Sequence, residues 1–172
     1  MIKVCKAKIS DAEVLAKLSA QTFLSSHGHS ASKSDIENYV LKNFSTESYR
    51  IELTDSRHQY YLIYFNNQLA GYSKIVLDSP QKKVKASNIT YMSRLYLLKE
   101  FYGQNLGAYL FDFNIDISKK NNQTGIWLAV WVENIRAIAF YKKMGFVIID
   151  NYDFPISETH SNPNHIMYLE YK

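Results

Sequence analysis

Apolar and polar residues alternate at the start of the chain, and this pattern predicts a first strand over residues 2–8. Ser10, with Glu13 three positions later, is typical of a helix start in which the two residues cap each other. Gly28 is a natural end for this helix. Two shorter helices are expected to follow, over about residues 34–41 and 45–53.

The middle of the chain has the alternating pattern of strands. Tyr60–Phe65 and Leu69–Leu77 are joined by Asn66-Asn67, and asparagine tolerates the positive φ of a tight turn. A third strand is expected from about Ile89 to Leu98. The lysine-rich segment 81–85 between the last two strands is predicted to be a solvated turn.

The second half of the chain alternates between helix and strand. Apolar residues recur at helical spacing over Leu106–Ser118, whereas Ile126–Val132 is apolar on both faces, as in a strand with helices on each side. A further helix is expected over Asn134–Met144. Two closing strands, Phe146–Ile149 and His165–Tyr171, complete the chain.

This order of elements predicts an α/β (α+β) fold, built on a mixed, mostly antiparallel central sheet with helices on both faces. The strand–helix–strand–helix unit implies one parallel pair of strands within that sheet. Where two neighbouring parallel strands splay, a ligand can enter between them. No repeat, low-complexity tract or flexible linker interrupts the pattern, so residues 1–172 are expected to form a single domain.

Composition narrows the classes of function. The net charge is +4, but the basic residues are scattered, so no nucleic-acid partner is expected. No apolar run approaches the ~18 residues that span a bilayer, and the N-terminus lacks the features of a signal peptide. The single cysteine, Cys5, is predicted to be a buried structural thiol, which suits a cytoplasmic location. No metal and no membrane partner are expected, and a homodimer is compatible with the aromatic strands.

The sharpest signal is the segment Trp131–Val147, which reads WVENIRAIAFYKKMGFV. Asn134 and Tyr141 are seven residues apart, two helical turns, and therefore share one face of the predicted helix. Ala137 lies between them, and its small side chain lets a ligand or another backbone come close. Gly145 provides a left-handed exit from the helix. The alternative is that Tyr141 is a core residue with a hydrated hydroxyl.

This segment resembles the Asn-x-x-Ala-x-x-Phe-Tyr-x-x-x-Gly-Phe motif of the GNAT superfamily of acetyl-CoA-dependent N-acetyltransferases. The order of the expected strands is similar to that family's fold over essentially the whole chain. The resemblance implies that Asn134, Ala137 and Lys143 contribute to the acetyl-CoA site. It also implies that Tyr141 stands near the thiol as general acid. A phenol with a pKa of ~10 is protonated at neutral pH and can protonate a departing thiolate.

A second segment lies where the family has its phosphate-binding loop, Gln/Arg-x-x-Gly-x-Gly/Ala, between a strand and a helix. Backbone N–H groups at a helix N-terminus bind pyrophosphate. Here Tyr102 replaces the usual Gln or Arg, and Asn105 replaces the first glycine; asparagine is the best substitute where φ is positive. The resemblance assigns acetyl-CoA binding to the whole loop, which consists of Tyr102, Gly103, Gln104, Asn105, Leu106, Gly107 and Ala108.

The strand before this loop is expected to bind the acetyl and pantetheine groups. In the family its backbone N–H groups hold the acetyl carbonyl and the pantetheine amides. The resemblance places that role on the main chain of Leu95, Tyr96 and Leu97. Many relatives also carry a glutamate on this strand as general base, but Tyr91 and Ser93 occupy those positions. The amine must then lose its proton to another group.

A histidine after the first helix is the candidate for that base. The arrangement Gly28-His29, five residues after Phe23, is similar to that of several small bacterial members of the family. Histidine titrates near neutral pH and can accept a proton. His29 is therefore the predicted catalytic base, with His27 as the less favoured alternative.

Across most of its length the chain also looks like bacterial polyamine N-acetyltransferases of the spermidine/spermine type. A polyamine needs carboxylates in its groove, and the candidates are Asp35, Glu37, Asp153 and Glu158. The basic net charge disfavours a polycation and leaves peptide amines, amino acids or aminoglycosides open.

The expected function is therefore transfer of an acetyl group from acetyl-CoA to a primary amine of a small, polyamine-like molecule. The amine would attack directly in a ternary complex. Two alternatives stay open, a protein or peptide N-acetyltransferase and a non-catalytic acetyl-CoA sensor. The missing strand glutamate and the altered loop motivate the sensor, whereas Tyr141 argues against it, since a sensor needs no proton donor.

Overall fold

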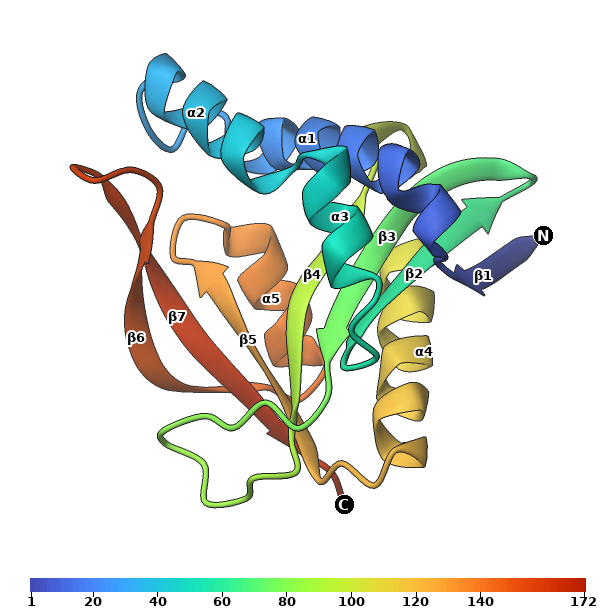
Figure 1. Cartoon of the computed structure of the whole chain (residues 1–172). Coiled ribbons are helices and arrows are strands. Elements are labelled where there is room, and N and C mark those ends of the chain that lie inside the picture. Colours follow the sequence, from blue (N-terminus) through green and yellow to red (C-terminus); the bar gives the residue numbers. More distant parts are fainter.

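The structure is a computed structural model that describes all 172 residues. Its strands are β1 (Ile2–Lys6), β2 (His58–Phe65), β3 (Gln68–Val76), β4 (Thr90–Leu97), β5 (Gly125–Trp131), β6 (Val147–Pro155) and β7 (Ser161–Glu170). They form one seven-stranded sheet in the order β1-β2-β3-β4-β5-β7-β6 (Figure 1). Every neighbouring pair is antiparallel except β4 and β5, which are parallel. The predicted fold class is confirmed.

The helices cover both faces of this sheet and are α1 (Ala12–His27), α2 (Lys33–Asn43), α3 (Thr46–Glu52), α4 (Leu106–Lys120) and α5 (Ile135–Lys143). Alternate residues of a strand face opposite sides, so the sheet separates two cores. Tyr60 and Leu62 of β2 pack with α1, α2 and α3, whereas Tyr61 and Ile63 pack with α4 and α5. None of the helices combines the length and apolar character needed to cross a membrane.

The turn between β2 and β3 has the predicted geometry. Asn66 and Asn67 have φ values of 48° and 65°, so both residues adopt the left-handed conformation of a tight hairpin. Asparagine tolerates this conformation because its short polar side chain can hydrogen-bond locally.

The start of the first helix differs from the predicted capping pair of Ser10 and Glu13. A 3-10 turn, Ile9–Asp11, precedes α1, and Asp11 Oδ2 accepts a hydrogen bond from the Lys8 N–H at 2.7 Å. Asp11 therefore caps this 3-10 turn, and the predicted pair of Ser10 and Glu13 does not form the cap. Cys5, expected to be buried, is half-buried on β1.

The closing strands are longer than predicted. β6 continues to Pro155, and β7 begins at Ser161, so residues 161–164, which lie before the predicted strand, also belong to the sheet. Pro163 has no N–H, but its carbonyl accepts a hydrogen bond from the Val132 N–H at 3.0 Å. This contact and the pairing of Pro163 with Asp153 keep the segment in the sheet.

The parallel strands diverge after only two paired positions, Thr90 with Ile126 and Tyr91 with Trp127. Beyond them β4 continues to pair with β3, whereas β5 pairs along its length with β7. The facing edges of β4 and β5 therefore lack a strand partner over the rest of their length. Figure 1 shows the two strands drawing apart towards α1. The splay that the sequence predicts is present.

Candidate active site

A cleft of about 240 Å³ lies between the diverging strands. Residues of β4 and β5 form its walls, α5 borders it on one face of the sheet, and α1 and α2 border it on the other. Most of its lining is apolar or aromatic, and no aspartate or glutamate contributes to it. The cleft thus reaches both sides of the sheet through the gap between β4 and β5.

Tyr141 of α5 lines this cleft. Its side chain is 9% exposed and packs edge-on against Phe140 and Phe146. The hydroxyl has no hydrogen-bond partner in the protein, yet it is not enclosed, because the only enclosed side-chain N or O atom without a partner is His58 Nδ1. The hydroxyl of Tyr141 therefore opens into the cleft. Burial raises the pKa of Tyr141, so the phenol stays protonated at neutral pH.

The start of α5 is fixed at the edge of the cleft by Asn134. Its Oδ1 accepts a hydrogen bond from the Ala137 N–H at 3.2 Å, and both residues line the cleft with Tyr141. Gly145 has a φ of 95°, which is the predicted left-handed exit. Lys143 is exposed in the last turn of α5, at the end of the helix away from Asn134, where its charge suits the helix dipole.

The N-terminus of α4 has free hydrogen-bond donors. Asn105 precedes the helix with a φ of 59°, the positive value anticipated from its replacement of a glycine, and its side chain makes no capping hydrogen bond. The N–H groups of Leu106, Gly107 and Ala108 consequently have no acceptor in the protein. The Leu106 side chain is fully buried and anchors this turn. Such a helix end favours anions.

A cation from another element stands beside this loop. Arg136, in the first turn of α5, lies over the ring of Tyr102, with its guanidinium carbon 4.1 Å from the ring centroid. Sequence reasoning did not single out Arg136. The sequence nevertheless carried a sign of such a role. A cation in the first turn of a helix is unfavourable against the helix dipole, so its presence there suggests a function other than stabilising the helix.

The strand β4 offers its main chain to the cleft. Leu95, Tyr96 and Leu97 pair with β3 on one edge, while the opposite edge has no strand partner. Gly71 on β3 lies directly against the backbone of Tyr96, where any Cβ would collide with the Tyr96 carbonyl oxygen. This part of β4 is therefore held closely by β3 and left open towards β5.

The two histidines near the cleft have different surroundings. His27, at the end of α1, lines the cleft and stacks on Phe23 with ring centroids 5.0 Å apart. Burial, and secondarily the charge of His29, lowers the pKa of His27 to about 4, so its ring is neutral at pH 7. His29 is exposed, does not line the cleft, and lies at its rim with its ring centroid 5.3 Å from that of Trp131.

Arg94 on β4 is the only Lys or Arg that lines the cleft. Its Nη1 donates to the hydroxyl of Tyr49 at 2.7 Å and to that of Tyr60 at 3.4 Å, and the guanidinium lies over the ring of Phe44. Burial lowers the pKa of Arg94, but the surrounding tyrosines and Glu52 raise it more. The net pKa lies above the ordinary value, so the group is always charged. Sequence reasoning did not assign Arg94 a role.

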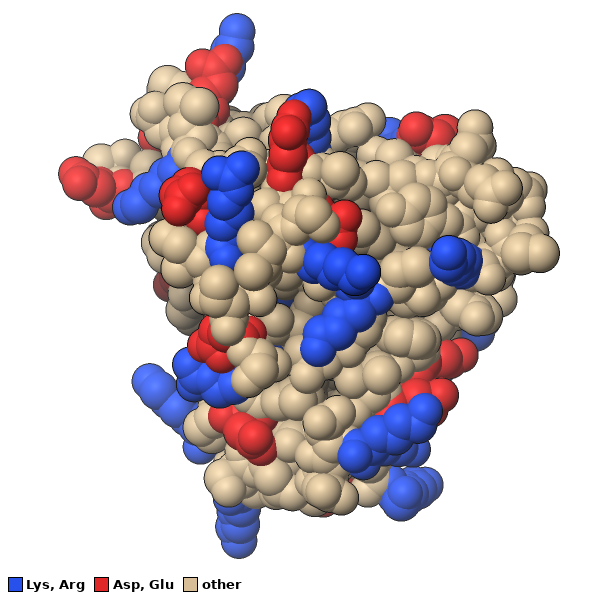
Figure 2. All heavy atoms as spheres, turned by 45° about the vertical axis from the view of Figure 1, so that its right-hand side comes forward, with Lys and Arg blue, Asp and Glu red and all other residues tan.

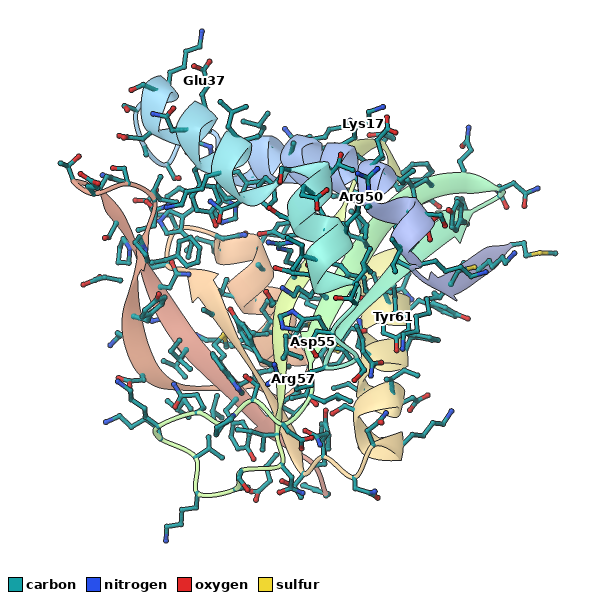
Figure 3. All side chains as sticks on the ribbon, viewed as in Figure 1. Lys17, Glu37, Arg50, Asp55, Arg57 and Tyr61 are labelled. Carbon is teal, nitrogen blue, oxygen red and sulfur yellow. The ribbon has the colours of Figure 1, made fainter.

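The four carboxylates considered for a polyamine lie outside this cleft. Glu37 is exposed and projects from the outer end of α2 (Figure 3), and Asp153 is exposed on β6. Asp35 and Glu158 line a second recess, between α2 and the β6–β7 turn, together with Lys42. On the face shown in Figure 2, acidic and basic side chains are interspersed over the surface.

A hydrogen-bonded bridge lies beside the cleft. His160 Nε2 lies 2.8 Å from the Ser30 carbonyl oxygen and 3.0 Å from Asn162 Oδ1. The Asn162 amide also donates to Ser30 Oγ at 2.8 Å. These contacts join the α1–α2 loop to the β6–β7 turn, and Asn162 lines the cleft beneath them.

Solved structures with this fold are N-acetyltransferases. The PaiA N-acetyltransferase of Thermoplasma acidophilum, in complex with coenzyme A, superposes with a TM-score of 0.80 at 22% identity and covers 99% of both chains. The ribosomal-protein-S18-alanine N-acetyltransferase of Escherichia coli has a TM-score of 0.71 at 16% identity, over 99% of this chain and 94% of that one. At these identities the likeness shows the fold alone. The fold is therefore that of these N-acetyltransferases.

Sequence comparison leads to the same class. An uncharacterized N-acetyltransferase of Lactobacillus delbrueckii subsp. lactis is 24% identical over 91% of both chains. One from Mycobacterium tuberculosis is 26% identical over 90% of this chain and 94% of its own. The model of the acetyltransferase (GNAT) family matches residues 23–146. The chain therefore belongs to the acetyltransferase (GNAT) family, and it is an acetyltransferase enzyme.

Proposed function

We propose that this protein transfers an acetyl group from acetyl-CoA to the primary amine of a small molecule, by direct attack of the amine in a ternary complex. The observation that carries the proposal is the Tyr141 hydroxyl, which is protonated, unpartnered and open to the cleft. A hydroxyl that is free of protein partners and open to the cleft is available to a group bound there.

Three parts of the chain suit acetyl-CoA. The free N–H groups at the start of α4, with Arg136 held over Tyr102 beside them, suit the pyrophosphate. The unpartnered edge of β4 at Leu95–Leu97 presents N–H and C=O groups as it would to a neighbouring strand, and these suit the amides of the pantetheine arm. When bound, acetyl-CoA supplies an acetyl group activated as a thioester.

Residues of the chain then protonate the departing sulfur and accept the proton of the amine. As the amine nitrogen forms its bond to the acetyl carbon and the C–S bond breaks, the Tyr141 hydroxyl can protonate the sulfur. The amine loses a proton in return. Tyr91 and Ser93 line the cleft but are not bases at neutral pH, and His27 is too weak a base to hold a proton there. His29 at the rim remains the predicted acceptor of that proton.

The limited volume of the cleft, about 240 Å³, supports a small acceptor. A polyamine is the acceptor that the sequence resemblance implies. Its free ammonium groups would have to reach Asp35 and Glu158 in the second recess, since the cleft itself contains no carboxylate. The structure therefore gives a polyamine less support than it gives other small amines.

We further expect the enzyme to act in the cytoplasm, where a single cysteine stays reduced and needs no disulfide partner. A homodimer would use the outer strand β6, which exposes Val147, Ile148 and Tyr152. Both remain expectations.

An acceptor screen tests the proposal. The purified chain is mixed with acetyl-CoA and, separately, with spermidine, an aminoglycoside, free amino acids and a short peptide. Free thiol and product mass are then measured. We expect thiol release that depends on one small amine and a product heavier by one acetyl group. Acetylation of the peptide alone would support a protein acetyltransferase. Binding of acetyl-CoA without acceptor-dependent thiol release would support a sensor.

A further inference from the structure

No carboxylate pairs directly with the positive charge of Arg94. None of the salt bridges includes it. Glu52, the carboxylate in the network beneath α3, is instead bound by Lys74 Nζ at 2.6 Å and by the Tyr60 hydroxyl. Two cations, Arg94 and Lys74, therefore share the single carboxylate of Glu52. A deeply placed cation that is not fully compensated is costly, because little water remains to solvate it.

The guanidinium of Arg94 also has N–H donors that bind no protein atom. Nη1 supplies both hydrogen bonds to Tyr49 and Tyr60. Nε and Nη2 donate to no protein atom. Neither is enclosed, because His58 Nδ1 is the only enclosed side-chain N or O atom that lacks a hydrogen-bond partner. Because Arg94 lines the cleft, these donors are open to it. Nε and Nη2 form one edge of the guanidinium plane, and such an edge binds a carboxylate or phosphate with two parallel hydrogen bonds.

Arg94 and Tyr141 lie on opposite faces of the sheet. Tyr49, Tyr60 and Phe44, which surround Arg94, belong to the core beneath α1, α2 and α3. Tyr141 belongs to the core that includes α4 and α5. The cleft connects the two through the splay of β4 and β5. With the thioester at Tyr141, a group at Arg94 is part of the acceptor.

We infer that Arg94 binds an anionic group of the acceptor, so that the substrate carries a carboxylate or a phosphate in addition to its primary amine. This inference rests on the proposed function and narrows it to amines of the amino-acid or aminoalkyl-phosphate type. A neutral amine would leave the excess positive charge of Arg94 and Lys74 over Glu52 uncompensated, and a polycation would be repelled by it.

Arg94 also holds α3 against the sheet through Tyr49, and this structural role must be separated from the binding role. The structural contact uses Nη1 alone. Tyr49→Phe removes that contact and leaves the Nε–Nη2 edge intact, so it is the matched control. Arg94→Met removes the charge and keeps much of the side-chain volume. Arg94→Lys keeps the charge but lacks the two parallel donors of the guanidinium edge.

Paired acceptors provide the test. The pairs are β-alanine with its amide, 4-aminobutyrate with its amide, and 2-aminoethyl phosphate with ethanolamine. We expect the anionic member of at least one pair to have a KM about 10- to 100-fold lower than its neutral partner. Arg94→Met should abolish this preference, Arg94→Lys should keep part of it, and Tyr49→Phe should keep it. The carboxylate and phosphate pairs identify which anion is preferred. Equal KM values within every pair, or an unchanged preference in Arg94→Met, would overturn the inference.

A binding measurement separates this inference from the proposed function. Calorimetry with the CoA-loaded protein compares N-acetyl-β-alanine with its amide, and N-acetyl-aminoethyl phosphate with N-acetylethanolamine. Tighter binding of an anionic member, lost in Arg94→Met, supports the anion site even if no amine is acetylated; the proposed function alone would then fail. Equal binding within both pairs overturns the anion site while leaving acetyl transfer standing. If Arg94→Met does not fold, the wild-type pairs and Arg94→Lys decide the question.

Discussion

The guanidinium of Arg136 lies 4.1 Å from the ring centroid of Tyr102, and this contact joins the first turn of α5 to the loop that precedes α4. Tyr102 occupies the position at which the family resemblance expects Gln or Arg. The side chain that brings positive charge to the free N–H groups of α4 therefore comes from a different helix. We propose that both residues help to hold acetyl-CoA.

Replacing Arg136 should weaken the binding of acetyl-CoA. We expect Arg136→Ala to raise the Kd for acetyl-CoA about 10-fold, the value of one lost charge-assisted hydrogen bond. Tyr102→Phe, which keeps the aromatic ring beneath the guanidinium, should bind acetyl-CoA like the wild type. Calorimetry at low and high salt measures both variants, and the difference should shrink at high salt. An unaltered Kd in Arg136→Ala would remove the residue from the donor site.

Asn105 should be replaceable by glycine but not by alanine. Its φ of 59° costs a residue with a Cβ about 1 kcal/mol or more, unless a short polar side chain compensates. We expect Asn105→Gly to have nearly the wild-type free energy of unfolding, and Asn105→Ala to lose about 1 kcal/mol. Urea denaturation compares the three proteins. Equal stability of the alanine variant would show that the loop relaxes out of the left-handed conformation.

Removal of the Tyr141 hydroxyl should affect turnover and little else. The hydroxyl has no protein partner, so Tyr141→Phe breaks no hydrogen bond and should fold normally. We expect turnover to fall about 10²- to 10⁴-fold, the usual contribution of a general acid. The Kd for acetyl-CoA should stay close to that of the wild type. Wild-type turnover in this variant would exclude Tyr141 as the acid.

The stability of the protein should depend on the protonation of His27. The folded-state pKa of about 4 lies below the unfolded value of 6.5, so the unfolded chain binds more protons between these values. Stability due to this group is complete above pH 6.5 and is lost as the pH falls towards 4, by about 3 kcal/mol in total. Urea denaturation from pH 7 to pH 4 should show this slope, and His27→Gln should reduce it. A slope identical in both proteins would mean that His27 is not desolvated.

Features that depend on neighbouring residues could be predicted from the sequence. The left-handed turn at Asn66 and Asn67, the positive φ of Asn105 and the exit at Gly145 each follow from the local preference of one or two residues. The splay of β4 and β5 followed from the order of strands and helices. Asn134, Ala137 and Tyr141 share the cleft because helical spacing places them on one face.

Features that depend on tertiary contacts could not be predicted. Residues 161–164 have poor strand propensity, but pairing with β6 and a hydrogen bond to Val132 keep them in the sheet. The role that we propose for Arg94 depends on the ion pair between Glu52 and Lys74, which is a contact between α3 and β3. His27 and His29 are two residues apart, and only the packing of α1 against the sheet decides which one lines the cleft.

Only two strand-to-strand pairings join the first four strands of the sheet to the last three. A ligand between β4 and β5 would act as an eighth strand and would bridge the part of the sheet that has the fewest pairings. Saturation with a donor at 100 times its Kd would add about 2.7 kcal/mol to the free energy of unfolding. In a cell, the lifetime of this enzyme against unfolding and proteolysis would then follow the supply of its own donor.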